Sequence, residues 1–222
     1  MRARVREIDT SAGTARAHLH RPERPACSAG TVLLGHGAGA GVESRDLQAL
    51  SALTSTGWTV ALLEQPWRVA GRRVATAPPT LDAATQGMVE RLGAGRWALP
   101  RPWVLGGRSA GARVACRLAH QSGAAAVLAL AFPLVPPSRS SRPARSRAPE
   151  LLEPVRHGIP LLVAQGARDR FGGPAQVLEA LAEPAVPAPA RVEVCEMPGD
   201  HGPTSDPAAL VRAVSAFLDG LP

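Results

Sequence analysis

Three residues that together could perform nucleophilic catalysis occur in this sequence in the order serine, aspartate, histidine. Ser109 lies in Gly107-Arg108-Ser109-Ala110-Gly111, a G-x-S-x-G match, and Asp169 and His201 follow later apolar segments. A serine hydroxyl is a poor nucleophile unless a nearby base accepts its proton. We expect His201 to be that base and Asp169 to hold the histidine ring in the required tautomer.

The sequence around Ser109 predicts the local structure that such a nucleophile needs. An apolar strand over residues 102–105 runs into the glycine-flanked turn, and a helix is expected over residues 110–120. In a nucleophile elbow the serine occupies a strained corner between strand and helix, so its hydroxyl projects above the sheet edge. The flanking glycines leave room for neighbouring backbone, and the helix N-terminus favours developing negative charge.

A second glycine-rich turn supplies the other half of an oxyanion hole. Gly35-His36-Gly37-Ala38-Gly39 follows a buried-type strand over residues 31–34. Stabilising an oxyanion takes a backbone N–H from this loop and one from the residue after the nucleophile. We therefore expect the N–H groups of Ala38 and Ala110 to form it. His36 is expected to shape the loop rather than act as a base.

Each of the three residues also has a simpler structural interpretation. Ser109 could cap a helix, Asp169 could occupy a turn, and His201 could be an ordinary loop residue. Their joint occurrence, each after a predicted strand end, favours the triad. Asp200 and Asp206 compete for the role of the acid, but the side chain of Asp200 should point away from its neighbour His201.

The apolar periodicity predicts an α/β fold. Strands are expected over residues 2–8, 14–20, 31–34, 58–63, 102–105, 125–132, 159–164 and 191–196, and helices over residues 44–56, 80–92, 110–120, 173–181 and 208–218. This alternation predicts a doubly wound, mostly parallel sheet with helices on both faces. Right-handed crossovers place the strand C-terminal ends, and so the site, on one edge. We expect a single domain over residues 1–222.

The loops complete this prediction. Residues 64–67 are expected to leave their strand as a loop, and residues 136–149, rich in proline, serine and arginine, are expected to be exposed. No substantial lid is predicted between Phe132 and Ile159. The site should therefore be open and shallow, which favours small or exposed acyl substrates.

The charge distribution and the cysteine content limit the classes of ligand and the cellular compartment that we expect. The formal net charge is +7, every basic residue other than histidine is arginine, and the arginines are spread from Arg2 to Arg212. A nucleic-acid interface more often clusters its basic residues on one element, so none is expected. Cys27, Cys116 and Cys195 have no metal-type spacing, and their odd number suits a reducing compartment.

No metal, organic cofactor or membrane association is therefore expected. The charged N-terminus lacks an apolar signal region, and the longest apolar run is too short to span a bilayer. We expect a cytoplasmic protein that acts on a small-molecule acyl substrate. The oligomeric state is left open.

Four segments of the chain resemble the α/β-hydrolase superfamily. They are Leu34-Gly35-His36-Gly37-Ala38-Gly39, Gly106-Gly107-Arg108-Ser109-Ala110-Gly111, Gly166-Ala167-Arg168-Asp169 and Gly199-Asp200-His201. The similarity is greatest to a small lidless branch related to dienelactone hydrolases, which includes the testis-expressed protein 30. The resemblance implies the α/β-hydrolase fold with Ser109, Asp169 and His201 as the triad. Dienelactone hydrolases use a cysteine nucleophile, so their substrate is not carried over.

Two other functions compete with the predicted serine hydrolase, which we expect to cleave an ester or thioester bond through an acyl-enzyme. Residues 35–40 also fit the dinucleotide-binding pattern G-x-G-x-x-A, with Glu64 at the end of the next strand as the ribose-binding acid. Alternatively, the fold could be a catalytically silent scaffold that binds a protein partner. Its surface would be the arginine-rich loop containing Arg139, Arg142, Arg145 and Arg147.

Three arginines are candidates for contacts at the edge of the site. Arg72, Arg73 and Arg108 lie in predicted loops that could reach it. If they do, they would favour a negatively charged substrate. Ordinary surface positions explain these arginines equally well.

Overall fold

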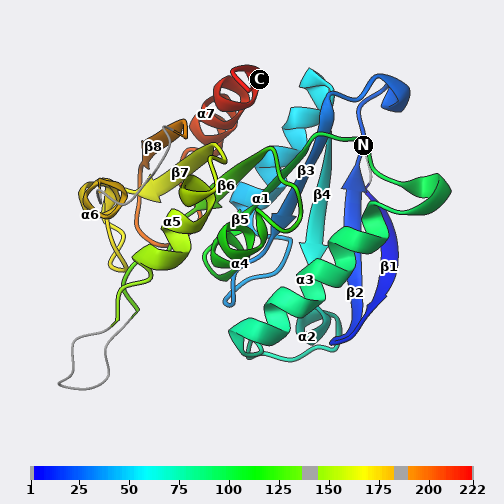
Figure 1. The fold of residues 1–222 in the computed structure, drawn as a ribbon, viewed down its shortest axis with the longest axis horizontal. Helices are drawn as coiled ribbons and strands as arrows, with labels where there is room; N and C mark the ends of the chain where they lie inside the picture. The colour runs from blue at the N-terminus through cyan, green and yellow to red at the C-terminus, as the bar shows by residue number, and fades with distance from the viewer. Residues whose placement is uncertain (1–2, 137–144, 183–189, 222) are drawn as a thin grey trace.

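An eight-stranded sheet forms the centre of the molecule (Figure 1). The computed structural model describes residues 3–136, 145–182 and 190–221. The sheet has the strand order β1-β2-β4-β3-β5-β6-β7-β8. The strands are β1 Arg4–Thr10, β2 Gly13–His20, β3 Gly30–Gly35, β4 Trp58–Glu64, β5 Trp103–Arg108, β6 Ala126–Leu130, β7 Leu161–Gly166 and β8 Val192–Met197.

The pairing of the strands places the site. The strands β1 and β2 form an antiparallel hairpin, β2 pairs antiparallel with β4, and all remaining pairs are parallel. The chain moves from β3 to β4 on one side and then returns to β5 on the other side of β3. This reversal opens a crevice beyond the C-terminal ends of β3 and β5, where doubly wound sheets bind ligands.

Helices cover both faces of the sheet. They are α1 Arg45–Ala49, α2 Pro66–Val69, α3 Pro78–Leu92, α4 Ala110–Leu118, α5 Ala148–Arg156, α6 Pro174–Leu181 and α7 Pro207–Asp219, with 3-10 turns at Pro25–Cys27, Leu50–Thr56 and Gly95–Trp97. One apolar core lies under α3, α4 and α5, and a second lies under α1 and α7. Figure 1 shows α3, α4 and α5 on the near side of the sheet. The predicted doubly wound fold is confirmed.

Local element predictions needed three corrections. Residues 44–56 form the short helix α1 followed by a 3-10 turn, although Leu47, Leu50 and Leu53 are buried as expected. Residues 66–69 form helix α2 rather than a loop. The helix α5 was not predicted, because Pro149 and Pro154 conceal it; proline is tolerated in a first turn, where Pro149 stands.

The structure describes only part of the arginine-rich stretch, residues 136–149. Its residues 137–144, including Arg139 and Arg142, lie outside the described residues, whereas its last residues begin α5. Across the three described ranges, no helix combines the length and apolar character needed to cross a membrane.

Candidate active site

Ser109 occupies a strained corner between β5 and α4. Its backbone has φ 52° and ψ −108°, a conformation that residues with a side chain rarely adopt. The corner brings two glycines against the loop after β3. A Cβ on Gly107 would lie 2.5 Å from the carbonyl oxygen of Gly35, and a Cβ on Gly111 would meet the same group. The G-x-S-x-G pattern is therefore required by backbone packing.

A chain of hydrogen bonds joins Ser109, His201 and Asp169. The Oγ of Ser109 lies 2.9 Å from Nε2 of His201, and Nδ1 of His201 lies 2.7 Å from Oδ2 of Asp169. Because a carboxylate only accepts, Nδ1–H donates to Asp169 and Nε2 is free to accept from the serine hydroxyl. The structure brings together three residues that lie 32 and 92 positions apart in sequence.

Asp169 is buried and fixed by further donors. Its Oδ2 accepts from Nε2 of Gln165 at 2.9 Å, and its Oδ1 accepts from the backbone N–H of Phe171 at 2.8 Å. The Gln165 amide also bonds both backbone groups of Phe132, which ties β7 to the end of β6. Sequence motifs do not predict this role of Gln165. A lone amide in the apolar strand Leu161–Gly166 was the available signal.

The competing carboxylates are occupied elsewhere. Oδ1 of Asp200 accepts from the backbone N–H of Gly202 at 2.7 Å, and Asp206 caps α7 by accepting from the N–H of Ala209. His201 instead contacts the ring of Phe171, edge to face, with the centroids 4.5 Å apart. The His201 ring is thus held by a carboxylate on one side and an aromatic ring on another.

Arg108 lies in a strand rather than in a loop, and its predicted role at the edge of the site stays a prediction. It is the last residue of β5 and is buried, with Nε 2.9 Å from Oδ2 of Asp46. Another guanidinium nitrogen donates to the main-chain carbonyl of His201. Asp46 in turn accepts from the backbone N–H of Leu47 at 2.9 Å. Arg108 is therefore a structural link beneath the histidine loop.

His36 shapes the loop after β3. Its Nδ1 donates to the carbonyl of Gly37 at 2.8 Å, and its Nε2 accepts from the backbone N–H of Gln65 at 3.1 Å. Both ring nitrogens are thus used by backbone groups. Burial lowers the pKa of His36, which keeps the ring neutral, as this pair of bonds requires.

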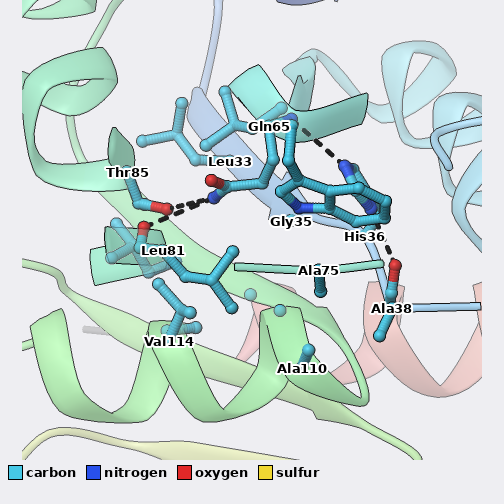
Figure 2. A pocket seen from close by; sticks show the side chains of 17 residues that line it. Leu33, Gly35, His36, Ala38, Gln65, Ala75, Leu81, Thr85, Ala110 and Val114 are labelled. Carbon is cyan, nitrogen blue, oxygen red and sulfur yellow. Dashed lines mark hydrogen bonds between the residues drawn. The ribbon is translucent and has the colours of Figure 1, made fainter. Parts of the chain in front are cut away.

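Ala38 and Ala110 lie at the same pocket, which adjoins the serine corner (Figure 2). Ala110 is the first residue of α4, so its N–H has no acceptor within the helix. Gly37, in the same loop as Ala38, packs against the serine: a Cβ there would lie 3.5 Å from Cβ of Ser109. The two residues predicted to supply the oxyanion donors therefore line one pocket beside Ser109, and their role as donors stays a prediction.

The pocket itself is lined mostly by apolar groups. Figure 2 shows its walls coming from β3, α3 and α4, with Gln65 bonded to Thr85 across it. The lining residues include Leu33, Leu63, Ala75, Leu81, Val114 and Trp67. The pocket next to Ser109 has the character of a small-ligand site, with apolar walls and few polar groups.

Across the residues that the structure describes, the remaining residues that the sequence suggested for a site form no hydrogen bond or ion pair with Ser109, His201 or Asp169. Arg72 and Arg73 are exposed, and Arg72 lines a separate hollow beside the β1–β2 turn. Their role at the site edge stays a prediction. Glu64, the ribose-binding acid of the dinucleotide alternative, is ion-paired with His18 at 2.9 Å. Within the described part of the chain, no three metal-binding side chains form a cluster.

Comparison with protein families identifies one match. A family model described as an alpha/beta hydrolase domain matches residues 28–205. The match includes both glycine loops and the three hydrogen-bonded residues Ser109, Asp169 and His201. A comparison with curated proteins finds no significant match.

Solved structures share the fold at low sequence identity. An alpha-beta serine hydrolase homologue from Coxiella burnetii is 16% identical with a TM-score of 0.74, covering 100% of this chain and 99% of its own. A serine hydrolase without a lid from Xanthomonas campestris is 20% identical, with a TM-score of 0.68 and coverage of 100% and 98%. A thermophilic esterase from Thermogutta terrifontis is 17% identical, with a TM-score of 0.70 and coverage of 97% and 91%.

Proposed function

The chain belongs to the alpha/beta hydrolase domain family, and from this premise we propose that it is a serine hydrolase that cleaves a carboxylic ester or thioester. The observation that carries the proposal is the continuous hydrogen-bond chain from Ser109 through His201 to Asp169. Orientation of a neutral imidazole by a buried carboxylate is what a serine needs to become a nucleophile. No metal or cofactor takes part in the proposed reaction.

In the first half of the reaction Ser109 is acylated. As Oγ attacks the carbonyl carbon of the substrate, its proton passes to Nε2 of His201. Negative charge develops on the carbonyl oxygen, where the N–H groups of Ala38 and Ala110 stabilise it. The tetrahedral intermediate then collapses, the bond to the leaving group breaks, and His201 returns the proton to the departing alkoxide or thiolate.

In the second half water replaces the leaving group. His201 takes a proton from water, the resulting hydroxide attacks the acyl carbon, and the carboxylic acid leaves as Ser109 recovers its proton. Asp169 stays ionised throughout and stabilises the imidazolium of each half-reaction. Gln165 and Arg108 act as positioning residues, because they bond to Asp169 and to the His201 backbone.

The lidless-branch assignment made from the sequence motifs is part of this proposal. The stretch between β6 and β7 contains one described helix, α5, and the structural neighbour from Xanthomonas campestris is described as lacking a lid. An open site of this kind supports small or exposed acyl substrates rather than long lipids.

The test is labelling with a fluorophosphonate, measured by intact mass. We expect stoichiometric labelling of the wild type, none of Ser109→Ala, and greatly slowed labelling of His201→Ala and Asp169→Asn. The matched control is Ser122→Ala, which removes a buried serine outside the site. A folded wild type that does not react would contradict the proposal and favour a catalytically silent scaffold.

A further inference from the structure

A buried hydrogen-bond donor in the pocket beside Ser109 has no partner. Trp67, in helix α2, lines this pocket and is only 3% exposed. Across the described residues its indole Nε1 finds no acceptor. A buried donor without an acceptor costs free energy, so native structures rarely keep one without a reason.

The neighbouring buried polar groups are satisfied by one another. Nε2 of Gln65 donates to Oγ1 of Thr85 at 2.8 Å and to the carbonyl of Leu81 at 3.4 Å, as Figure 2 shows. The backbone N–H of Gln65 is bonded to His36, whose ring lies 5.5 Å from that of Trp67 in an edge contact. None of these groups accepts a hydrogen bond from the Trp67 N–H. The indole N–H is therefore unpaired although the polar groups around it are hydrogen-bonded.

The walls of the rest of the pocket are mostly apolar. Figure 2 shows Ala38 and Ala110 on one side of the pocket and Leu81 and Thr85 on the opposite side. The expected oxyanion donors thus lie at one end, and apolar side chains line the way inward. A simple alkyl chain would satisfy these walls but would leave Nε1 of Trp67 unpaired.

We propose that this pocket takes the acyl part of the substrate, and that the preferred acyl group is short and carries an oxygen acceptor for Nε1 of Trp67. The acceptor would be a ketone, ether or hydroxyl oxygen a few atoms from the scissile carbonyl. This inference rests on the proposed hydrolase function and adds to it the class of acyl group. A site built around a buried donor discriminates against an isosteric group that lacks the acceptor.

A matched pair of esters tests the selectivity. The 4-nitrophenyl esters of 4-oxopentanoic acid and 4-methylpentanoic acid have the same number of heavy atoms, and only the first carries an acceptor. Each kcat/KM is divided by the ester's hydroxide-catalysed rate constant to remove intrinsic reactivity. We expect the wild type to prefer the oxo ester by about tenfold, which corresponds to the net contribution of one typical hydrogen bond.

Two variants assign this preference to the indole N–H. Trp67→Phe keeps an aromatic ring but removes the donor, and it should reduce the preference to about onefold, mainly by slowing the oxo ester. Trp58→Phe changes a buried tryptophan of the other core and should leave the preference intact. Equal use of both esters by the wild type, or an unchanged preference in Trp67→Phe, would overturn the inference while leaving the hydrolase function in place.

A binding experiment separates this inference from the proposed function. In Ser109→Ala protein labelled with ¹⁵N-tryptophan, 4-oxopentanamide and 4-methylpentanamide are titrated without turnover. The chain contains four tryptophans, and the indole signal of Trp67 is the one missing from Trp67→Phe. A downfield shift of this proton with the oxo amide alone supports the hydrogen bond, and no shift overturns it. Failure of the hydrolase function shows separately, as absent fluorophosphonate labelling.

Discussion

The guanidinium of Arg108 donates a hydrogen bond to the main-chain carbonyl of His201. The residue immediately before the proposed nucleophile thus holds the loop that carries the proposed base. The same guanidinium is ion-paired with buried Asp46, which lies in the first turn of α1. The relative position of nucleophile and base therefore depends on a charge pair that does not touch the reacting atoms.

Breaking this pair should destabilise the protein strongly. Arg108→Met leaves Asp46 as a buried charge without its partner, which costs about 3–5 kcal/mol of unfolding free energy. In the double variant Arg108→Met/Asp46→Leu neither charge remains, so the loss should be clearly smaller than the sum of the two single losses. Urea unfolding of the four proteins measures this coupling. Additive losses would show that the two side chains do not depend on each other.

Removing the amide beneath Asp169 should slow the reaction more than it weakens binding. Gln165→Met keeps the volume but loses the bond to Oδ2 of Asp169, so the carboxylate is less well oriented toward His201. We expect kcat on a 4-nitrophenyl ester to fall about tenfold with little change in KM. Gln121→Met, at an exposed position, is the control. A change confined to KM would argue that Gln165 acts on substrate binding instead.

The strained corner at Ser109 should cost stability. A side chain at φ 52° and ψ −108° is unfavourable, and glycine relieves that strain. The free energy of unfolding of Ser109→Gly should therefore be about 1 kcal/mol higher than that of Ser109→Ala, because alanine keeps the strain. Both variants lack the hydroxyl, so both should be unreactive toward fluorophosphonate. Equal stabilities in chemical denaturation would contradict the strain.

Stability should fall at mildly acidic pH through His36. Burial lowers its pKa in the folded state, so the unfolded chain takes up a proton more readily. The stabilising contribution is complete above the unfolded value, about 6.5, and is lost as pH falls below it. His36→Gln cannot be protonated and should lose less stability between pH 7.5 and about 5.5 than the wild type does. Exposed His120→Gln is the control, and it should follow the wild type.

Most of the fold could be predicted because its signals are local. Apolar runs such as Thr31–Leu34 and Ile159–Ala164 each gave rise to a parallel strand, with ends shifted by a residue or two. Errors occurred where local signals conflict. Pro149 and Pro154 hid the helix α5, and Pro66 hid α2, since a proline read in isolation indicates a loop. Pro66 and Pro149 stand in a first helical turn, where proline is tolerated, whereas Pro154 lies inside α5.

The sequence by itself determined which residues could do chemistry and where they would meet. Ser109, Asp169 and His201 each follow a strand, and the C-terminal ends of parallel strands share one edge, so their convergence follows from the order of elements. The glycines around Ser109 could be anticipated for the same reason, because a sharp corner excludes side chains.

Only the tertiary structure decided how these groups are supported and what surrounds them. The pairing of Arg108 with Asp46 joins segments distant in sequence. The bond from Gln165 to Asp169 and the unpaired N–H of Trp67 depend on how the surrounding chain packs around these side chains. Nothing in the local sequence indicates whether an arginine faces solvent or a buried carboxylate. That choice is made by the balance of desolvation and pairing, which exists only once the chain has folded.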